Sequence, residues 1–163
     1  PGEFVGLSLL GTDRLHFSVQ SVTSVNLCIF DREQLSAYVS RKPQLWRRIV
    51  QAHAREAAAA DNRLTDLGRR SAHERIARLI LELHGRLRLR GAVQDNAFRF
   101  PLRQQHIADA LGLTSIHVSR VLGRLRADRL VALDRSTLTI LDHGEMMKLA
   151  GTTDRDQDFP SLR

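Results

Sequence analysis

The segment from Gln104 to Gly123 reads QQHIADALGLTSIHVSRVLG, a spacing typical of two short helices joined by a tight turn. Two helices that cross at a steep angle need a small residue at their contact and apolar side chains on their facing sides. These positions hold Ala108 and the apolar set Ile107, Leu111, Val118 and Val121. Gly112 lies where the first helix must end, and this position favours a residue able to adopt positive φ. We therefore predict a helix-turn-helix.

The second helix of such a motif carries the side chains that read DNA. Thr114 is a suitable N-cap for it, because its hydroxyl can accept a hydrogen bond from the first turn. The early, outward positions of this helix enter the major groove in known helix-turn-helix proteins. We expect contacts to base edges from Ser115, Ile116, Ser119 and Arg120. The alternative interpretation is an ordinary pair of amphipathic helices in an all-α protein.

The charge distribution agrees with binding to a phosphate backbone. The 163-residue chain has a net charge of +7. Residues 68–130 hold 13 arginines and 5 acidic residues, a net charge of +8, so the rest of the chain sums to −1. A basic face beside a groove-reading helix is expected of a protein that binds double-stranded DNA. A solvated face of ordinary surface arginines is the alternative.

Composition narrows the class of protein further. Apolar residues make up 42% of the chain, enough for a core, and no apolar run is long enough to span a membrane. The N-terminus lacks the pattern of a signal peptide, and the single cysteine, Cys28, excludes an internal disulfide framework. We expect a cytoplasmic, nucleoid-associated protein. The seven histidines are dispersed without metal-ligand spacing, so we expect neither an enzyme nor a metal site.

The N-terminal segment predicts the end of a β-domain. Residues 14–30 alternate apolar and polar side chains, which favours two strands. Their expected inward set is Phe17, Val19, Val22, Val25, Leu27 and Ile29. Two strands cannot close a sheet alone, so we expect an N-terminal part of this domain to be missing.

A long helix follows this segment. Asp31 and Gln34 predict the start of a short helix to about Val39, and Pro43 is well placed to begin the next one. No glycine or proline interrupts the chain from Pro43 until Gly68, which we expect to act as a hinge or C-cap. One apolar stripe would pair with the same helix of a second chain, although it could also pack within its own domain. The predicted dimer interface is Leu45, Ile49, Ala52, His53, Ala57, Ala60, Leu64 and Leu67.

The C-terminal half predicts a winged helix-turn-helix. Ser71 and Glu74 form a capping box at the start of a helix, residues 91–97 read as a polar loop, and residues 98–102 read as a short strand. A hairpin of residues 130–133 and 138–141 follows the helix-turn-helix, and Asp142 with Glu145 caps a last helix. We predict an α+β, mostly α, fold. Its parts are a partial β-domain (1–42), the long helix and hinge (43–68), the winged helix-turn-helix (69–150) and a loose tail (151–163).

This order of elements resembles the Crp/Fnr family of bacterial transcription factors from Gly2 to about Ala150, most specifically over Ile107 to Arg126. The resemblance implies a homodimer that presents two recognition helices to a roughly palindromic DNA site and works with RNA polymerase. Arg120 matches the arginine that contacts a guanine edge, whereas Ile116 replaces the family's usual glutamate and would instead pack on a thymine methyl. The predicted backbone contacts are Arg103, Gln104, Gln105, Thr114, His117, Arg124 and Arg135.

The same resemblance places an effector site at the N-terminus. Its candidate residues are Gly2, Glu3, Gly6 and Arg14. Leu7 and Leu15 stand where cyclic-AMP-binding members have polar ligands, and unpaired ribose hydroxyls would cost about 1–3 kcal/mol each. We therefore expect neither cyclic-AMP binding nor another cofactor. The alternative function for the whole chain is a winged-helix module that binds protein or RNA without reading DNA sequence.

Overall fold

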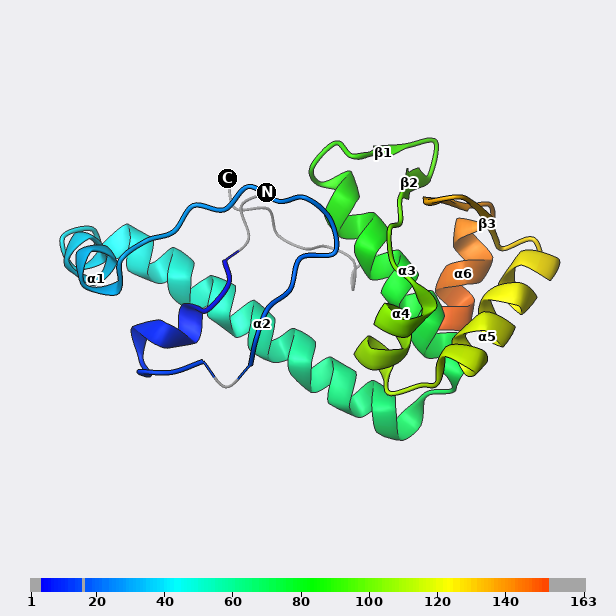
Figure 1. The fold of residues 1–163 in the computed structure, drawn as a ribbon, viewed down its shortest axis with the longest axis horizontal. Coiled ribbons are helices and arrows are strands. Elements are labelled where there is room, and N and C mark those ends of the chain that lie inside the picture. Colours follow the sequence, from blue (N-terminus) through cyan, green and yellow to red (C-terminus); the bar gives the residue numbers. More distant parts are fainter. Residues whose placement is uncertain (1–3, 16, 153–163) are drawn as a thin grey trace. The chain divides into compact units, whose positions relative to one another are not determined.

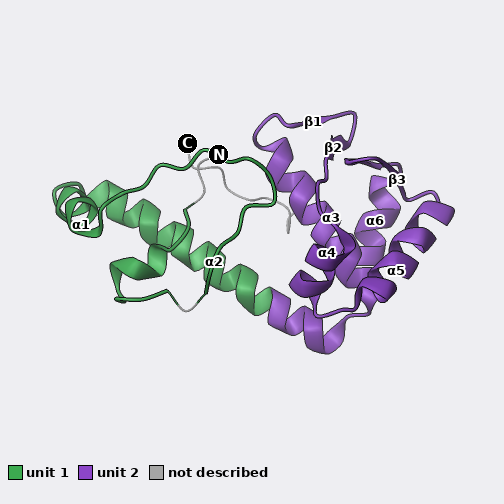
Figure 2. Cartoon of the chain, in the orientation of Figure 1, with its two compact units in different colours: residues 1–62, 162 green, residues 63–161, 163 purple. Residues whose placement is uncertain are grey.

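The computed structural model describes residues 4–15 and 17–152. Helices predominate in these residues, and the strands form one small antiparallel sheet, which confirms the α+β, mostly α, prediction. The chain divides into two compact units, the first ending at residue 62 and the second beginning at residue 63 (Figure 2). This boundary falls inside helix α2, several residues before Gly68. The last residues of α2 therefore belong to the second unit.

The first unit holds a short 3-10 helix η1 (Leu7–Leu10), helix α1 (Arg32–Ser40) and the beginning of α2 (Pro43–Arg69), as Figure 1 shows. The described residues between η1 and α1 form no strand, so the prediction of two strands in 14–30 is wrong. All six side chains of the expected inward set are exposed, Ile29 to 92%. A strand is stabilised by partner strands and a covered face, and the described residues supply neither to this segment.

Both predicted helix starts in this unit are confirmed. The Asp31 carboxylate accepts a hydrogen bond from the Gln34 N–H at 2.9 Å, and Pro43 begins α2. Helix α2 runs for 27 residues and ends at Arg69, so Gly68 lies within its last turn and does not break it. The chain leaves the helix at Arg70. None of the residues of α2 is buried.

The second unit is built around helix α3 (Ala72–Arg88). Ser71 and Glu74 form the predicted capping box at its start. Strands β1 (Val93–Gln94) and β2 (Ala97–Arg99) follow, then helices α4 (Gln104–Leu111) and α5 (Ser115–Ala127). The predicted hairpin is present as β3 (Val131–Asp134) and β4 (Thr137–Ile140), and the Asp142 carboxylate caps α6 (His143–Ala150). The sheet is antiparallel with the order β1-β2-β4-β3.

Residues 91–97 are not the simple loop that we predicted. They contain β1 and a two-residue turn in which Asp95 and Asn96 have φ values of 47° and 61°. A two-residue hairpin turn with both φ values positive matches the twist of paired strands, and aspartate and asparagine tolerate that conformation better than other non-glycine residues. The Asp-Asn pair was the sequence signal for this hairpin.

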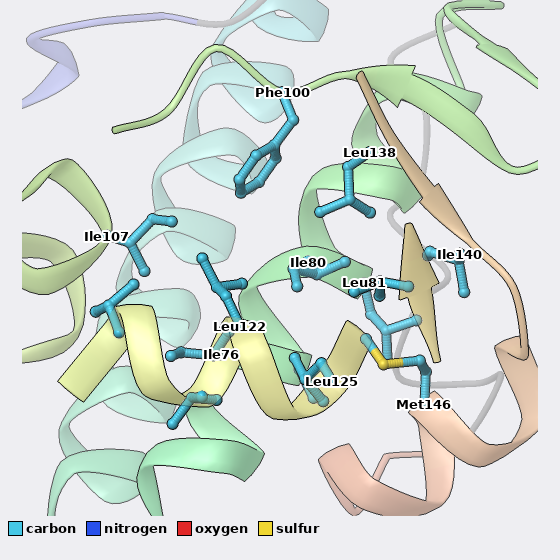
Figure 3. Packing of buried hydrophobic residues seen from close by; sticks show 14 of the residues in the cluster. Ile76, Ile80, Leu81, Phe100, Ile107, Leu122, Leu125, Leu138, Ile140 and Met146 are labelled. Carbon is cyan, nitrogen blue, oxygen red and sulfur yellow. The ribbon is translucent and has the colours of Figure 1, made fainter. Parts of the chain in front are cut away.

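One apolar core holds the second unit together. Figure 3 shows Ile76, Ile80 and Leu81 of α3 packed among side chains from the other elements. The neighbours labelled there are Phe100, Ile107, Leu122, Leu125, Leu138, Ile140 and Met146. Each large apolar side chain that is fully buried contributes about 1.5–3 kcal/mol. This packing fixes α5 and the hairpin to the same central helix.

His84 is the one polar side chain among the buried described residues. Its ring is 2% exposed and lies 5.8 Å from the Phe98 ring and 5.4 Å from the His143 ring, measured between centroids. Neither ring nitrogen has a hydrogen-bond partner among the described residues. Burial lowers the pKa of His84, and the charges of His143 and Arg88 lower it further. The folded unit therefore favours the neutral form of this imidazole.

We predict that the second unit loses stability in mild acid and that His84→Leu reduces the loss. Below the usual histidine pKa of about 6.5, the unfolded chain binds a proton that the folded chain does not, so unfolding becomes more favourable as the pH falls. Thermal unfolding of both proteins at about pH 7.5 and about pH 5 measures the effect. His117→Gln, which changes an exposed histidine of the same unit, is the control. An unchanged pH dependence in His84→Leu would contradict the prediction.

Candidate nucleic-acid interface

Helices α4 and α5 are joined by the three residues that the sequence marked as a turn. Gly112 has φ 61° and ψ 43°, the left-handed conformation that ends α4. The Thr114 hydroxyl accepts a hydrogen bond from the His117 N–H at 3.2 Å and so caps α5. Both turn predictions are confirmed. The pair therefore has the local geometry of a helix-turn-helix.

The two faces of α5 differ sharply. Its inner side chains are buried in the core: Val118, Val121, Leu122 and Leu125. Its outer face carries Ser119 and Arg120, which are exposed, and Ile116, which is 74% exposed. Because Ile116 is so exposed, its side chain adds almost no hydrophobic stabilisation to the fold. The outer face of α5 is thus available to a ligand.

Two of the predicted DNA contacts bond to each other. The Ser115 hydroxyl donates to Gln105 Oε1 at 2.8 Å, and Gln105 Nε2 donates to Asp109 Oδ1 at 2.8 Å. Ser115 is half-buried as a result. Gln105 Nε2 keeps a second N–H and the Ser115 oxygen keeps its acceptor lone pairs, so both side chains can contact DNA with these bonds in place. Sequence reasoning missed this pair because the two residues lie on different helices.

The other predicted backbone contacts on α4 and α5 are exposed. Arg103 and Gln104 are exposed at the beginning of α4, where the Arg103 N–H donates to His106 Nδ1 at 3.2 Å. His117 is exposed on the first turn of α5. Arg124 is exposed and lies 3.7 Å from the Asp128 carboxylate. A solvent-exposed pair of this kind contributes little to stability, so it leaves the guanidinium available.

The wing is the β3–β4 hairpin, residues 131–140. It carries the predicted Arg135, and Arg99, which we did not predict, lies on the neighbouring strand β2. Arg135 lies in the β3–β4 turn with φ 50°. Exposed Arg99 of β2 pairs in register with Thr137 of β4, and the Phe100 N–H donates to the Ser136 carbonyl at 2.7 Å. Alternation along residues 98–100 was the signal for Arg99, since Phe98 and Phe100 are buried and the residue between them must face outward.

Several arginines of the basic region hold the second unit together instead of facing solvent. Arg75 Nη1 donates to the Leu111 carbonyl at 2.7 Å, at the C-terminal end of α4. Arg78 forms an ion pair with Asp66 at 2.9 Å, and Arg86 forms one with Glu82 at 2.8 Å. The exposed arginines near the helix-turn-helix are Arg99, Arg103, Arg120, Arg124, Arg126, Arg129 and Arg135. The positive field of this face therefore comes from fewer side chains than the sequence count indicates.

The first residues of the exposed apolar stripe on α2 are not those of the predicted dimer interface. Leu45 and Ile49 are half-buried and line an apolar cavity of about 700 Å³ together with residues of α1. Trp46 and Val50, which we did not predict, are 52% and 49% exposed. With them the stripe has alternating steps of four and three residues, the repeat of a coiled coil. This heptad stripe is Trp46, Val50, His53, Ala57, Ala60, Leu64 and Leu67.

Only two of the four predicted effector residues, Gly6 and Arg14, lie among the described residues. Gly2 and Glu3 lie outside the described part of the chain. Gly6 precedes η1 with φ 83°, and Arg14 is exposed. In the ranges 4–15 and 17–152, no three histidine, cysteine or acidic side chains are grouped to hold a metal ion. None of the described helices is both long and apolar enough to cross a membrane.

These elements define a winged helix-turn-helix. Helix α5 packs on the core around α3, α4 precedes it, and the β3–β4 hairpin follows it. Residues 74–149 match the family model described as the Crp-like helix-turn-helix domain. Over 151 residues the chain is 35% identical to the nitrogen fixation regulation protein FixK of Bradyrhizobium diazoefficiens, covering 92% of this chain and 62% of that protein. It is 32% identical over 151 residues to the transcriptional activator protein Anr of Pseudomonas aeruginosa, covering 93% of this chain and 62% of that protein.

The solved structure of FixK2 from Bradyrhizobium japonicum has the same fold. It superposes with a TM-score of 0.66 at 24% identity, covering 75% of this chain and 60% of that one. These comparisons support a Crp/Fnr family regulator, with a Crp-like helix-turn-helix domain at residues 74–149. The chain spans about 62% of the length of the FixK and Anr proteins that it matches.

We predict that Gly112→Ala lowers the free energy of unfolding of the second unit by about 1–2 kcal/mol, because an alanine is strained in the left-handed conformation. Its Cβ would also lie 3.1 Å from Leu67 Cδ2. Gly123→Ala is the matched control, since that glycine is inside α5 with no atom within 4 Å of the added Cβ. It should raise stability by up to about 1 kcal/mol. Urea unfolding measures both, and equal effects would contradict the assignment of the turn.

Proposed function

We propose that this chain is the DNA-binding and dimerisation part of a transcription regulator. The observation that carries the proposal is the outer face of α5, where Ile116, Ser119 and Arg120 are exposed directly above a buried inner face. The relatives FixK and Anr are named as a regulation protein and a transcriptional activator. The exposed arginines beside α5 supply the positive field that attracts the phosphate backbone. Work with RNA polymerase, and a place on the nucleoid in the cytoplasm, follow from this role.

Different side chains of this surface contact different groups of the DNA. Arg120 can donate two hydrogen bonds to a guanine, and Ser119 contacts a neighbouring base. Ile116 has no polar atom and packs on a thymine methyl instead. Backbone contacts come from Arg103, Gln104, Thr114, His117, Arg124 and Arg135, joined by Arg99 of β2. Gln105 contributes through the second N–H of Nε2, and Ser115 through the acceptor lone pairs of its hydroxyl oxygen.

Dimerisation occurs through the heptad stripe of α2. The stripe is exposed along its length, with Trp46 at 52% and Leu64 at 69%. A sustained repeat of four and three residues is the pattern by which two helices pair side by side. The alanines at positions 57 and 60 allow the two helices to approach closely. Two recognition helices related by twofold symmetry then face a roughly palindromic site.

The outer face of α5 argues against catalysis. The relatives act as regulators, and the outer face of α5 has no nucleophile paired with a base, so catalysis is not proposed. A winged-helix module for protein or RNA is the remaining alternative. Binding to duplex DNA should weaken steeply with added salt, with a slope set by the number of phosphate contacts. We propose no cyclic-nucleotide effector, because Leu7 is buried and cannot bond a ribose.

We predict that Arg120→Ala weakens binding to the preferred duplex by about 1–3 kcal/mol and removes discrimination at one base pair. Competition between a duplex selected from random sequences and a random duplex measures both effects. Arg41→Ala, which removes the same charge from an exposed position in the first unit, is the control. Arg135→Ala should weaken both duplexes alike. Unchanged binding in Arg120→Ala would mean that α5 does not read bases.

We predict that Leu64→Asp raises the dissociation constant of the dimer about 100-fold or more, because a carboxylate would be buried in the apolar seam. Sedimentation equilibrium measures the constant. Leu27→Asp is the matched control, since Leu27 is 70% exposed and lies outside α2. A variant dimer as tight as the parent dimer would show that α2 does not pair through this stripe.

A further inference from the structure

The last turns of α2 are joined to the rest of the second unit by a shared carboxylate. Asp66 Oδ1 accepts from Arg70 Nε at 2.8 Å, and Asp66 Oδ2 lies 2.9 Å from Arg78 Nε on α3. The three side chains are only 16%, 25% and 24% exposed. Because they are largely withdrawn from water, their attraction is screened less than that of a surface pair. We call Asp66, Arg70 and Arg78 the junction triad.

The junction triad also reaches α6. Arg70 Nη1 donates to the Ala150 carbonyl at 2.8 Å, and Arg70 Nη2 donates to the Gly151 carbonyl at 3.4 Å. A Cβ at Gly151 would lie 2.5 Å from Arg70 Nη1, so a side chain at position 151 would displace the guanidinium. A cation at the C-terminal end of a helix also favours the partial negative charge there. The triad thus bonds α2 to both α3 and α6.

Polar bonds, rather than apolar burial, hold the last turns of α2 within the second unit. No residue of α2 is buried, so these turns present little apolar area to α3. Leu67 is an apolar neighbour of the turn before α5, since its Cδ2 lies 3.1 Å from a Cβ built at Gly112. Hydrogen bonds and ion pairs are directional, whereas apolar contacts tolerate sliding.

The same turns of α2 carry the end of the heptad stripe. Leu64 and Leu67 belong to the stripe, and Asp66 lies between them on a different side of the helix. In a dimer, this short segment therefore contacts the partner on one side and its own DNA-binding unit on another. A change of angle at the triad would move α5 relative to the twofold axis.

We propose that Asp66 is a positioning residue that sets the separation of the two recognition helices, and hence the spacing of the two DNA half-sites that the dimer accepts. The proposal rests on the proposed function, because it needs a dimer that reads two half-sites. Asp66 itself contacts no DNA. It acts through Arg78 on α3, on which α5 is packed.

The test compares Asp66→Asn with the parent on duplexes whose half-site spacing is changed by one or two base pairs, and on a single half-site. The parent should prefer one spacing. Asp66→Asn should reduce that preference on the order of tenfold, while its affinity for the single half-site stays within about twofold. Glu145→Gln removes an exposed ion pair with Lys148 in the same unit and should keep the spacing preference of the parent.

A second variant keeps the proposal testable if Asp66→Asn does not fold. Arg78→Gln leaves the Asp66–Arg70 bond in place and should lose the spacing preference by a similar factor. The double variant should lose no more spacing preference than Asp66→Asn alone, since both substitutions break the same Asp66–Arg78 pair. An unchanged spacing preference in the folded variants would overturn the proposal. So would an equal loss on the single half-site, which would indicate general destabilisation. A parent that prefers no duplex sequence would instead refute the proposed function, and this proposal with it.

Discussion

The burial of helix α3 is the constraint on which the rest of the second unit depends. Ile76, Ala77 and Ile80 are fully buried, and the inner face of α5 packs on the same core. This packing leaves α5 no freedom to rotate, because any rotation would bring buried valines and leucines into water. Ile116, Ser119 and Arg120 face outward for this reason alone. The DNA-reading face is thus a consequence of how the core is filled.

The arginines of the second unit serve two purposes that the sequence does not separate. Arg70 and Arg75 donate to the last carbonyls of α6 and α4, which a helix leaves without partners. Arg99, Arg120 and Arg135 point away from the core and supply charge. Both groups add to the same net charge in the sequence. Only their contacts show which of them can meet a phosphate.

Local features were predictable from sequence, and features that depend on distant partners were not. The caps at Asp31, Ser71 and Thr114 and the turn at Gly112 follow from interactions within a few residues, and all are present. The strands expected in residues 14–30 failed because alternation does not supply a neighbouring strand. The Ser115–Gln105 bond and the contacts of Asp66 join separate elements. The full heptad stripe was visible in the spacing of Trp46 and Val50, but Leu45 and Ile49 gave a competing stripe.

The wing turn carries an arginine where backbone geometry favours glycine. Arg135 has φ 50°, and a non-glycine residue in that region costs about 1–2 kcal/mol. A chain selected for heat resistance alone would place glycine at this tip, since nothing in the core depends on the side chain. Arginine at position 135 therefore supplies the proposed backbone contact at a cost in folding free energy. Position 135 is therefore where the free energy of unfolding and the proposed affinity for DNA make opposite demands on the side chain.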